Sequence, residues 1–185
     1  HDLIDPVANA VDDLTGLFNM FSFRKRAPNL IRELLSRGDS PRCVYFNIRN
    51  FHTYNETYGL AGGDRMLKSF ARILMDVFAD SLLSRFDKDH FVVIAPMRDL
   101  SDRIARMSNR INNLRRGIAV EMKAGVYVIN DADLDVSVIC DCAKFACESA
   151  KHEYGLVMQY YDGKLDQKAK LQKYIMEAFP AALAN

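Results

Sequence analysis

The residues Cys43-Val44-Tyr45-Phe46-Asn47-Ile48 form a nearly continuous apolar run. A strand that is covered on one face alternates apolar and polar residues, whereas an almost unbroken apolar run is typical of a strand covered on both faces. The sequence therefore predicts an interior strand at 43–48, with other elements packed on both sides of its sheet.

Hydrophobic periods along the rest of the chain switch between helical and strand-like spacing, which indicates an α/β or α+β domain. The runs at 82–86 and 91–95 are separated by Asp87-Lys88-Asp89-His90, the spacing of a β-hairpin. Further strands are expected at 118–129 and 156–161, and helices at 21–35, 63–78, 100–114, 139–150 and 171–179.

Composition excludes several classes of protein. The chain has 185 residues, 49% of them apolar, which suits one domain with a substantial core. Its 25 Lys and Arg nearly balance 24 Asp and Glu, so no overall field attracts nucleic acid or an anionic membrane. No apolar run reaches the roughly 18 residues of a membrane helix, and no signal peptide is recognisable, so a cytoplasmic location is expected.

The four cysteines suggest neither a zinc site nor a disulfide framework, because they include no CxxC pair and no matching histidine pair. Buried, reduced thiols are the expectation for Cys43, Cys140, Cys142 and Cys147.

Three sequence motifs point to one family. Residues 12–19, DDLTGLFN, are similar to the DxLTGLxN opening of GGDEF domains, and residues 46–59 resemble their DIDxFKxxNDxxG stretch, followed by Gly63-Asp64. Residues 85–91, RFDKDHF, stand where that family has RxGGDEF. The resemblance to GGDEF domains, the fold of bacterial diguanylate cyclases, implies a central mixed, mainly antiparallel sheet flanked by helices.

The resemblance also implies the division of the chain. Residues 1–20 would be an N-terminal segment that carries the first motif, and residues 21–164 the GGDEF-like domain. The last part, 165–185, is expected to be a helix that links to a following domain, and the junction resembles one that leads into an EAL phosphodiesterase domain. His1 as the first residue suggests a fragment of a longer protein.

The family's chemistry joins two GTP molecules into cyclic di-GMP, with divalent cations held by carboxylates. The corresponding positions here are Asn47, Asp89 and His90, so no catalytic set is intact. Asn47 brings an oxygen without charge, which leaves Asp89 as the one carboxylate of a weak Mg²⁺ site. The prediction is a catalytically inactive domain, with a residual diguanylate cyclase as the alternative.

Guanine recognition is better preserved. The family reads the base with residues that match Asn55 and Asp64, and an amide with a carboxylate can satisfy the hydrogen-bonding edge of guanine. The alternative is that Asn55 caps a turn and Asp64 caps the following helix.

The residues expected to contact the phosphates differ more from the family's motif than the residues expected to contact guanine. Asp87 and Lys88 replace two glycines that let phosphates approach the backbone, although both are also ordinary polar turn residues. Phe51 either lines the nucleotide pocket or belongs to the core. Lys151 is a weak phosphate clamp, because Gly155 stands where the resemblance implies an arginine.

These expectations combine into a degenerate GGDEF domain that serves as a regulatory module in cyclic di-GMP signalling. It would bind GTP or another guanine nucleotide weakly, or act purely as a structural dimerisation module. Expected partners are a second copy of the domain and a C-terminal EAL-type domain, with no nucleic acid and no membrane insertion.

Overall fold

The apolar run at 43–48 lies in the interior strand of the sheet. The computed structural model describes residues 10–114 and 117–178. Its helices are α1 (Met20–Ser36), α2 (Phe51–Val77), α3 (Leu100–Asn113), α4 (Val136–Lys151) and α5 (Gly163–Ala178), and its strands are β1 (Arg42–Arg49), β2 (Leu82–Asp87), β3 (His90–Ala95), β4 (Glu121–Val128) and β5 (Met158–Tyr160).

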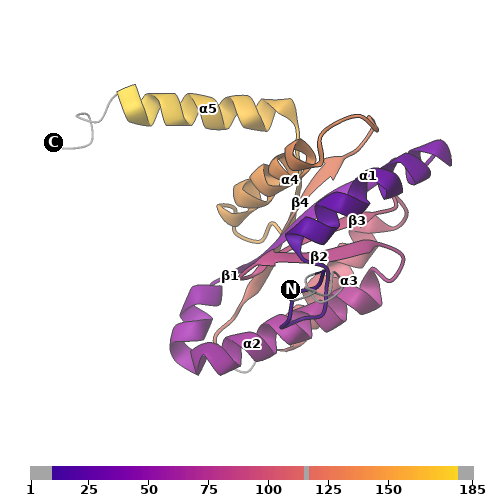
Figure 1. Cartoon of the computed structure of the whole chain (residues 1–185). Coiled ribbons are helices and arrows are strands. Elements are labelled where there is room, and N and C mark those ends of the chain that lie inside the picture. The colour runs from indigo at the N-terminus through magenta and orange to yellow at the C-terminus, as the bar shows by residue number, and fades with distance from the viewer. Residues whose placement is uncertain (1–9, 115–116, 179–185) are drawn as a thin grey trace, which may run out of the picture.

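The strands form a five-stranded sheet in the order β2-β3-β1-β4-β5 (Figure 1). Strand β1 is antiparallel to both β3 and β4, and β2 is antiparallel to β3, whereas β4 and β5 are parallel. The predicted mixed, mainly antiparallel sheet and the hairpin are therefore confirmed.

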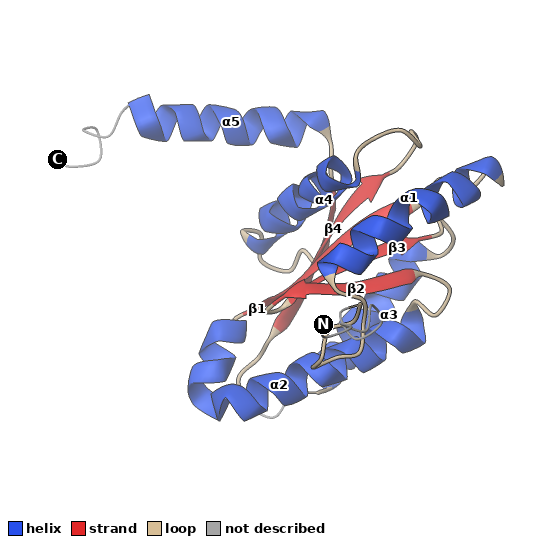
Figure 2. Ribbon diagram, in the orientation of Figure 1, coloured by secondary structure: helices blue, strands red, loops and turns tan. Residues whose placement is uncertain are grey.

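Helices cover both faces of the sheet (Figure 2). On β1, Val44, Phe46 and Ile48 pack into a core cluster with residues of α2 and α3. Cys43 and Tyr45 point to the opposite face, in a cluster with residues of α1 and α4. This alternation explains the unbroken apolar run, because each face of β1 has its own core.

The N-terminal motif begins the first helix. Asn19 is the N-cap of α1, and its side-chain oxygen accepts a hydrogen bond from the Ser22 backbone N–H at 2.9 Å. This satisfies a backbone donor that the first turn of a helix leaves free. The helix ends before Gly38, which has a φ of +79°.

The predicted start of the second helix was wrong. Helix α2 begins at Phe51 rather than Gly63, and its helical path is broken inside by Gly59, with φ 71° and ψ 174°. Glycine adopts this left-handed conformation without the clash of a Cβ atom. Most of the turns between Phe51 and Gly59 are exposed, so they have no buried stripe that periodicity could detect.

Other boundaries differ by a few residues. The strands expected at 118–129 and 156–161 are shorter, as β4 and β5. The predicted end of the last helix, Phe179, and residues 1–9 of the N-terminal segment lie outside the described part of the chain.

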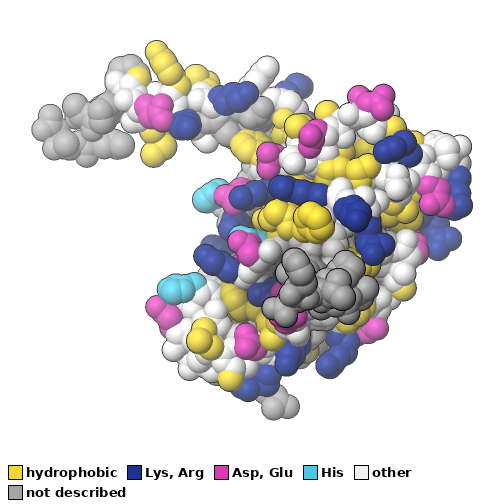
Figure 3. Space-filling model, viewed as in Figure 1, with side chains coloured by type: hydrophobic (Ala, Val, Ile, Leu, Met, Phe, Trp, Pro, Cys, Tyr) yellow, Lys and Arg dark blue, Asp and Glu magenta, His cyan; other side chains and the backbone are white. Residues whose placement is uncertain are grey.

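Helix α5 extends away from the body of the domain (Figure 1). It carries exposed apolar side chains, namely Leu171, Tyr174, Ile175 and Met176. On the face seen in Figure 3, acidic and basic side chains are interspersed, in keeping with a formal net charge of +1. Within the described residues, none of the helices is both long enough and apolar enough to span a membrane.

Candidate functional site

The turn between β2 and β3 places four polar residues at one edge of the sheet. Asp87 and Lys88 form its exposed tip, as predicted, and Asp89 and His90 are partly buried. The Arg85 side chain donates a hydrogen bond from Nε to the Lys88 carbonyl at 2.8 Å, which holds the turn closed. Lys88 has a φ of +41°, a conformation that favours glycine.

Asp89 reaches back to the interior strand. Its Oδ2 accepts a hydrogen bond from the Ile48 backbone N–H at 3.0 Å, so its carboxylate lies beside the residue that follows Asn47. The sequence predicted that Asn47 and Asp89 would converge; the structure places the Asp89 carboxylate on the backbone of Ile48, the neighbour of Asn47.

His90 lies on the same face of the sheet as Asn47. The last paired residues of β1 and β3 are Phe46 and Phe91, so the next positions outward on the two strands are Asn47 and His90. The His90 ring lies 5.7 Å from the ring of Tyr45, which shares the face of Asn47. Burial, with contributions from nearby acidic groups and Cys147, raises the pKa of Tyr45 well above its usual value.

His90 is held by a carboxylate from its own turn. Its Nδ1 lies 2.7 Å from Asp87 Oδ1, and its Nε2 lies 3.8 Å from Asp89 Oδ1. An ionised carboxylate can only accept a hydrogen bond, so in the neutral imidazole Nδ1 carries the proton and Nε2 keeps its lone pair. His90 therefore lies between the carboxylates of Asp87 and Asp89.

The expected guanine-reading residues, Asn55 and Asp64, both lie on α2. A Cβ atom on Gly63 would lie 1.7 Å from Asn55 Oδ1, so the Asn55 amide packs directly against this glycine, next to Asp64. Asn55 Oδ1 is buried without a hydrogen-bond partner, and Asp64 is exposed. Neither residue is the N-cap of α2, which is Asn50.

Residues 9–155 match the family model described as diguanylate cyclase, GGDEF domain. The chain belongs to the GGDEF family. The match takes in the sheet edge, the turn and the broken helix α2.

Curated relatives of this GGDEF domain include enzymes that make and enzymes that degrade cyclic di-GMP. The probable diguanylate cyclase DgcE of Escherichia coli is 26% identical over 150 residues, which cover 76% of this chain and 14% of DgcE. The response regulator PleD of Caulobacter vibrioides is 34% identical over 120 residues, 64% of this chain and 26% of PleD. The cyclic di-GMP phosphodiesterase PdeB of Shewanella oneidensis is 26% identical over 162 residues, 83% of this chain and 18% of PdeB. The chain thus spans about a quarter or less of the length of these relatives.

Solved structures agree on the fold. The GGDEF domain of FimX from Pseudomonas aeruginosa is 16% identical with a TM-score of 0.70, over 82% of this chain and 98% of that chain. The S helix-GGDEF-EAL structure of LapD from Vibrio cholerae is 16% identical with a TM-score of 0.66, over 93% of this chain and 43% of that chain. At these identities the likeness concerns architecture.

The residues at the family's metal position do not fit Mg²⁺ well. Asn47 is 4% exposed, and its Oδ1 is buried without a hydrogen-bond partner, so it could contribute one neutral oxygen. Asp89 contributes the single carboxylate, with Oδ2 already bonded to the Ile48 N–H. Mg²⁺ prefers six oxygen ligands and charged carboxylates, which this pair does not provide.

The other expected ligand residues are dispersed. Phe51 belongs to the core cluster that contains α2 and α3, so its side chain serves packing. Lys151 is the last residue of α4, and Gly155 lies in the following loop with a φ of +78°.

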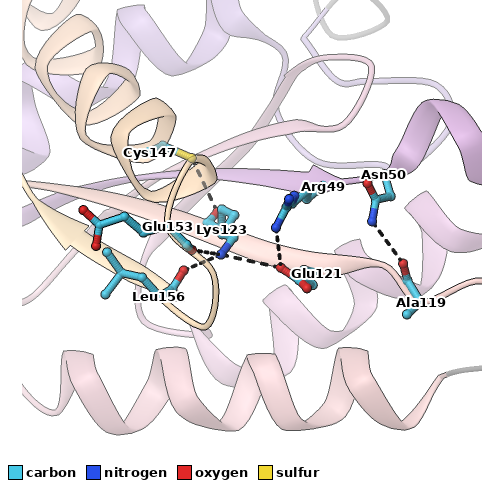
Figure 4. A network of polar contacts seen from close by, with 8 residues as sticks. All are labelled: Arg49, Asn50, Ala119, Glu121, Lys123, Cys147, Glu153 and Leu156. Atoms are coloured by element: carbon cyan, nitrogen blue, oxygen red, sulfur yellow. Dashed lines mark hydrogen bonds and ion pairs between the residues drawn. The ribbon is translucent and has the colours of Figure 1, made fainter. Parts of the chain in front are cut away.

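A polar network beside Asn47 was not found from the sequence (Figure 4). Lys123 is 1% exposed, and its Nζ donates to the carbonyls of Glu153 at 3.2 Å and Leu156 at 2.5 Å. Glu121 Oε2 lies 3.5 Å from the same Nζ and 3.3 Å from Arg49 Nη1. The signal was present as two charged residues, Glu121 and Lys123, within an otherwise apolar strand.

The network changes the electrostatics of the edge. Lys123 lies directly opposite Asn47 in the pairing of β1 with β4, and Arg49 lies opposite Glu121. Arg49 also stands where the second Asp of the family's DIDxF motif would be. The interior strand therefore carries an amide and a guanidinium where the motif has two carboxylates, so its attraction for a hard cation is reduced.

Proposed function

We propose that this chain is a degenerate GGDEF domain without diguanylate cyclase activity, which acts as a guanine-nucleotide-sensing regulatory module in a larger cyclic di-GMP signalling protein. The observation that carries the proposal is the pair Asn47 and Asp89. Asp89 reaches the backbone of Ile48, the neighbour of Asn47, so this edge has a single carboxylate, and one of its oxygens accepts the Ile48 N–H. Two-metal activation of a nucleotide needs more negative charge than this edge supplies.

The base-reading end supports nucleotide binding. The Asn55 amide packs against Gly63, the neighbour of Asp64 in the sequence, and Asp64 is exposed. At the positions expected to contact the phosphates, charged contacts are missing. Each missing charged contact reduces the free energy of binding by about 1.5–3 kcal/mol, so weak binding is expected. Loss of two such contacts weakens a micromolar site into the high micromolar to millimolar range.

The first experiment measures product. Purified protein is incubated with GTP and Mg²⁺ or Mn²⁺, and cyclic di-GMP is quantified by chromatography against a heat-killed control. We expect none above the control, and clear product would overturn the proposal of inactivity. The combined change Asn47→Asp, Asp87→Gly, Lys88→Gly and His90→Glu should recover more activity than any single reversion, because groups that act as a unit are strongly non-additive.

The second experiment tests guanine sensing by calorimetry. GTP and GDP should bind about equally and ATP more weakly, and Asp64→Ala should abolish the preference. Asp76→Ala is a matched control, because Asp76 lies on the same helix and pairs with Arg110 at 2.9 Å. If ATP binds as well as GTP, or if Asp64→Ala changes nothing, the sensing role is excluded.

A ligand-free interaction module is the second candidate. It is favoured by α5, whose exposed Leu171, Tyr174, Ile175 and Met176 give an unpaired apolar surface. We propose a cytoplasmic domain that contacts a second copy of itself or an EAL-type domain. The S helix-GGDEF-EAL structure of LapD, which matches over 93% of this chain, supports a contact with an EAL-type domain. Sedimentation of the wild type and of Tyr174→Glu tests self-association, since the charge should shift a dimer to monomer.

A further inference from the structure

We propose that the groove between α1 and the start of α4 is a contact surface for a second copy of this chain, with a two-fold axis along the groove. Helices α1 and α4 lie on the same face of the sheet (Figure 1). The groove between them has a volume of about 470 Å³ and is lined by Arg24, Pro28 and Arg32 of α1 and by residues 132–137. The contact involves neither α5 nor the expected nucleotide-binding residues, so it is tested separately from the proposed function.

The two walls of the groove carry opposite charges. Arg24 and Arg32 belong to the α1 wall, and Asp133 and Asp135 belong to the facing wall; all four residues are exposed. Among the residues that the structure describes, neither arginine has an ion-pair partner, and the Asp133 carboxylate has none either. Asp135 Oδ1 accepts the Ser137 backbone N–H at 2.7 Å, as the N-cap of α4. The charges of the two walls therefore do not neutralise each other within one chain.

This arrangement of charge is complementary to itself. In a two-fold symmetric interface the same surface of both copies meets, so the surface has to match its own rotated copy. A two-fold axis along the midline of the groove places the α1 wall of each copy against the 132–137 wall of the other. The two arginines of one copy then face the two aspartates of the other, and the same contacts occur a second time by symmetry. Because the charges on the two walls balance, the surface has no excess charge that would repel a second copy.

Exposed apolar side chains accompany the charges on both sides of the groove. Phe21 is 73% exposed, and it precedes Pro28 and Arg32 on α1 by seven and eleven residues, a spacing that puts the three on one face of a helix. Val138, in the first turn of α4, is 45% exposed. Aromatic residues and arginine are enriched in protein–protein interfaces. The composition of this surface, as well as its charge, is therefore that of a protein contact.

The mixture of charges favours a second copy over a small anion. A phosphate or carboxylate ligand attracted by Arg24 and Arg32 would also meet the carboxylates of Asp133 and Asp135, which repel it. A protein surface that carries both signs can match both walls at once. Exposed ion pairs are individually weak and are screened by salt, so the dimer should be weak and should dissociate at high ionic strength.

The experiment measures self-association by sedimentation velocity, without nucleotide, over a series of protein concentrations at low and at high salt. We expect the wild type to form a dimer that weakens as salt is added. One variant reverses the basic wall, Arg24→Glu with Arg32→Glu. The other changes the acidic wall, Asp133→Arg with Asp135→Asn, because asparagine keeps the N-cap of α4. Each variant alone should dimerise at least about tenfold more weakly than the wild type, since like charges then face each other.

Mixing the two variants is the decisive measurement. The reversed α1 wall of one variant then faces the changed acidic wall of the other, so a mixed dimer should form even though each variant alone is mostly monomeric. The matched control is Lys68→Glu with Arg72→Glu, which changes the net charge equally on exposed positions of α2, a helix on the opposite face of the sheet, and should leave the dimer unchanged.

Circular dichroism checks that each variant is folded. The proposal is overturned if the control weakens the dimer as much as the groove variants, or if folded variants form no mixed dimer. It is also overturned if the wild type is monomeric at every concentration, in which case the groove serves a different partner.

Discussion

Asp12 Oδ1 lies 2.9 Å from Arg85 Nη1, so the N-terminal motif is tied to the strand that leads into the Asp87-Lys88 turn. The same carboxylate accepts hydrogen bonds from the backbone N–H and the hydroxyl of Thr15, at 2.9 and 2.7 Å. Burial opposes the charge of Asp12, but these hydrogen bonds and Arg85 together lower its pKa. Two motifs that are far apart in the sequence thus form one structural unit.

Loss of this contact should destabilise the domain. The Arg85 and Asp12 side chains are 13% and 20% exposed, so Asp12→Ala leaves a largely buried guanidinium without its carboxylate. We expect the free energy of unfolding to fall by about 1.5–3 kcal/mol, measured by urea denaturation. Asp13→Ala, at the exposed neighbouring position, is the control, and an equal loss there would contradict the interpretation.

Acid stability should depend on a second ion pair. Arg103 donates to both oxygens of Asp80, at 2.5 and 2.7 Å, and lowers the pKa of Asp80 from 3.8 to about 2. A lowered pKa means that the folded chain binds fewer protons than the unfolded chain, so this stabilisation is present above pH 3.8 and is lost as the pH falls through about 2. We expect the free energy of unfolding, measured between pH 3.8 and about 2, to depend less on pH in Asp80→Asn than in the wild type. Arg103→Met should do the same, and an unchanged slope in both variants would argue against the pair.

Backbone strain at the turn should be relieved by glycine. Lys88 has a φ of +41°, where a residue with a Cβ atom is disfavoured by about 1 kcal/mol. We expect Lys88→Gly to raise the melting temperature and to add about 0.5–1 kcal/mol of stability. Lys88→Ala removes the charge but keeps the Cβ atom, so it should bring no such gain. If alanine stabilises as much as glycine, charge rather than strain is the cause.

The packing of α4 on β4 should not tolerate a side chain at Gly125. A Cβ atom there would lie 2.0 Å from the Ala143 carbonyl oxygen and 2.2 Å from the Cys147 nitrogen, both of which are backbone atoms. Gly125→Ala should therefore cost about 3 kcal/mol or more, as measured by thermal and chemical unfolding. Gly155→Ala is the comparison, because its φ of +78° brings strain but nothing lies within 4 Å of its Cβ position. A smaller loss at Gly125 than at Gly155 would mean that α4 shifts readily.

Local patterns in the sequence were sufficient for the sheet and for part of the site. The apolar run of β1 and the hairpin spacing around Asp87-Lys88 predicted the strands, because burial on both faces and tight turns impose residue types locally. The motif order predicted that Asp89 lies near Asn47, and its carboxylate accepts the N–H of the next residue, Ile48. The bend at Gly59 was missed, because the exposed turns before it lack a hydrophobic period.

Tertiary structure decided which polar groups face one another. No spacing rule places Lys123 across from Asn47, joins Asp12 to Arg85, or sets His90 between two carboxylates, because these contacts join separate elements or depend on the course of a turn. Such pairings are fixed only when the strands take their register and α4 packs against Gly125. The sequence by itself therefore determined the family and the architecture, because both rest on local residue patterns. Which charged and polar side chains meet at the edge of the sheet was decided only by packing between distant segments.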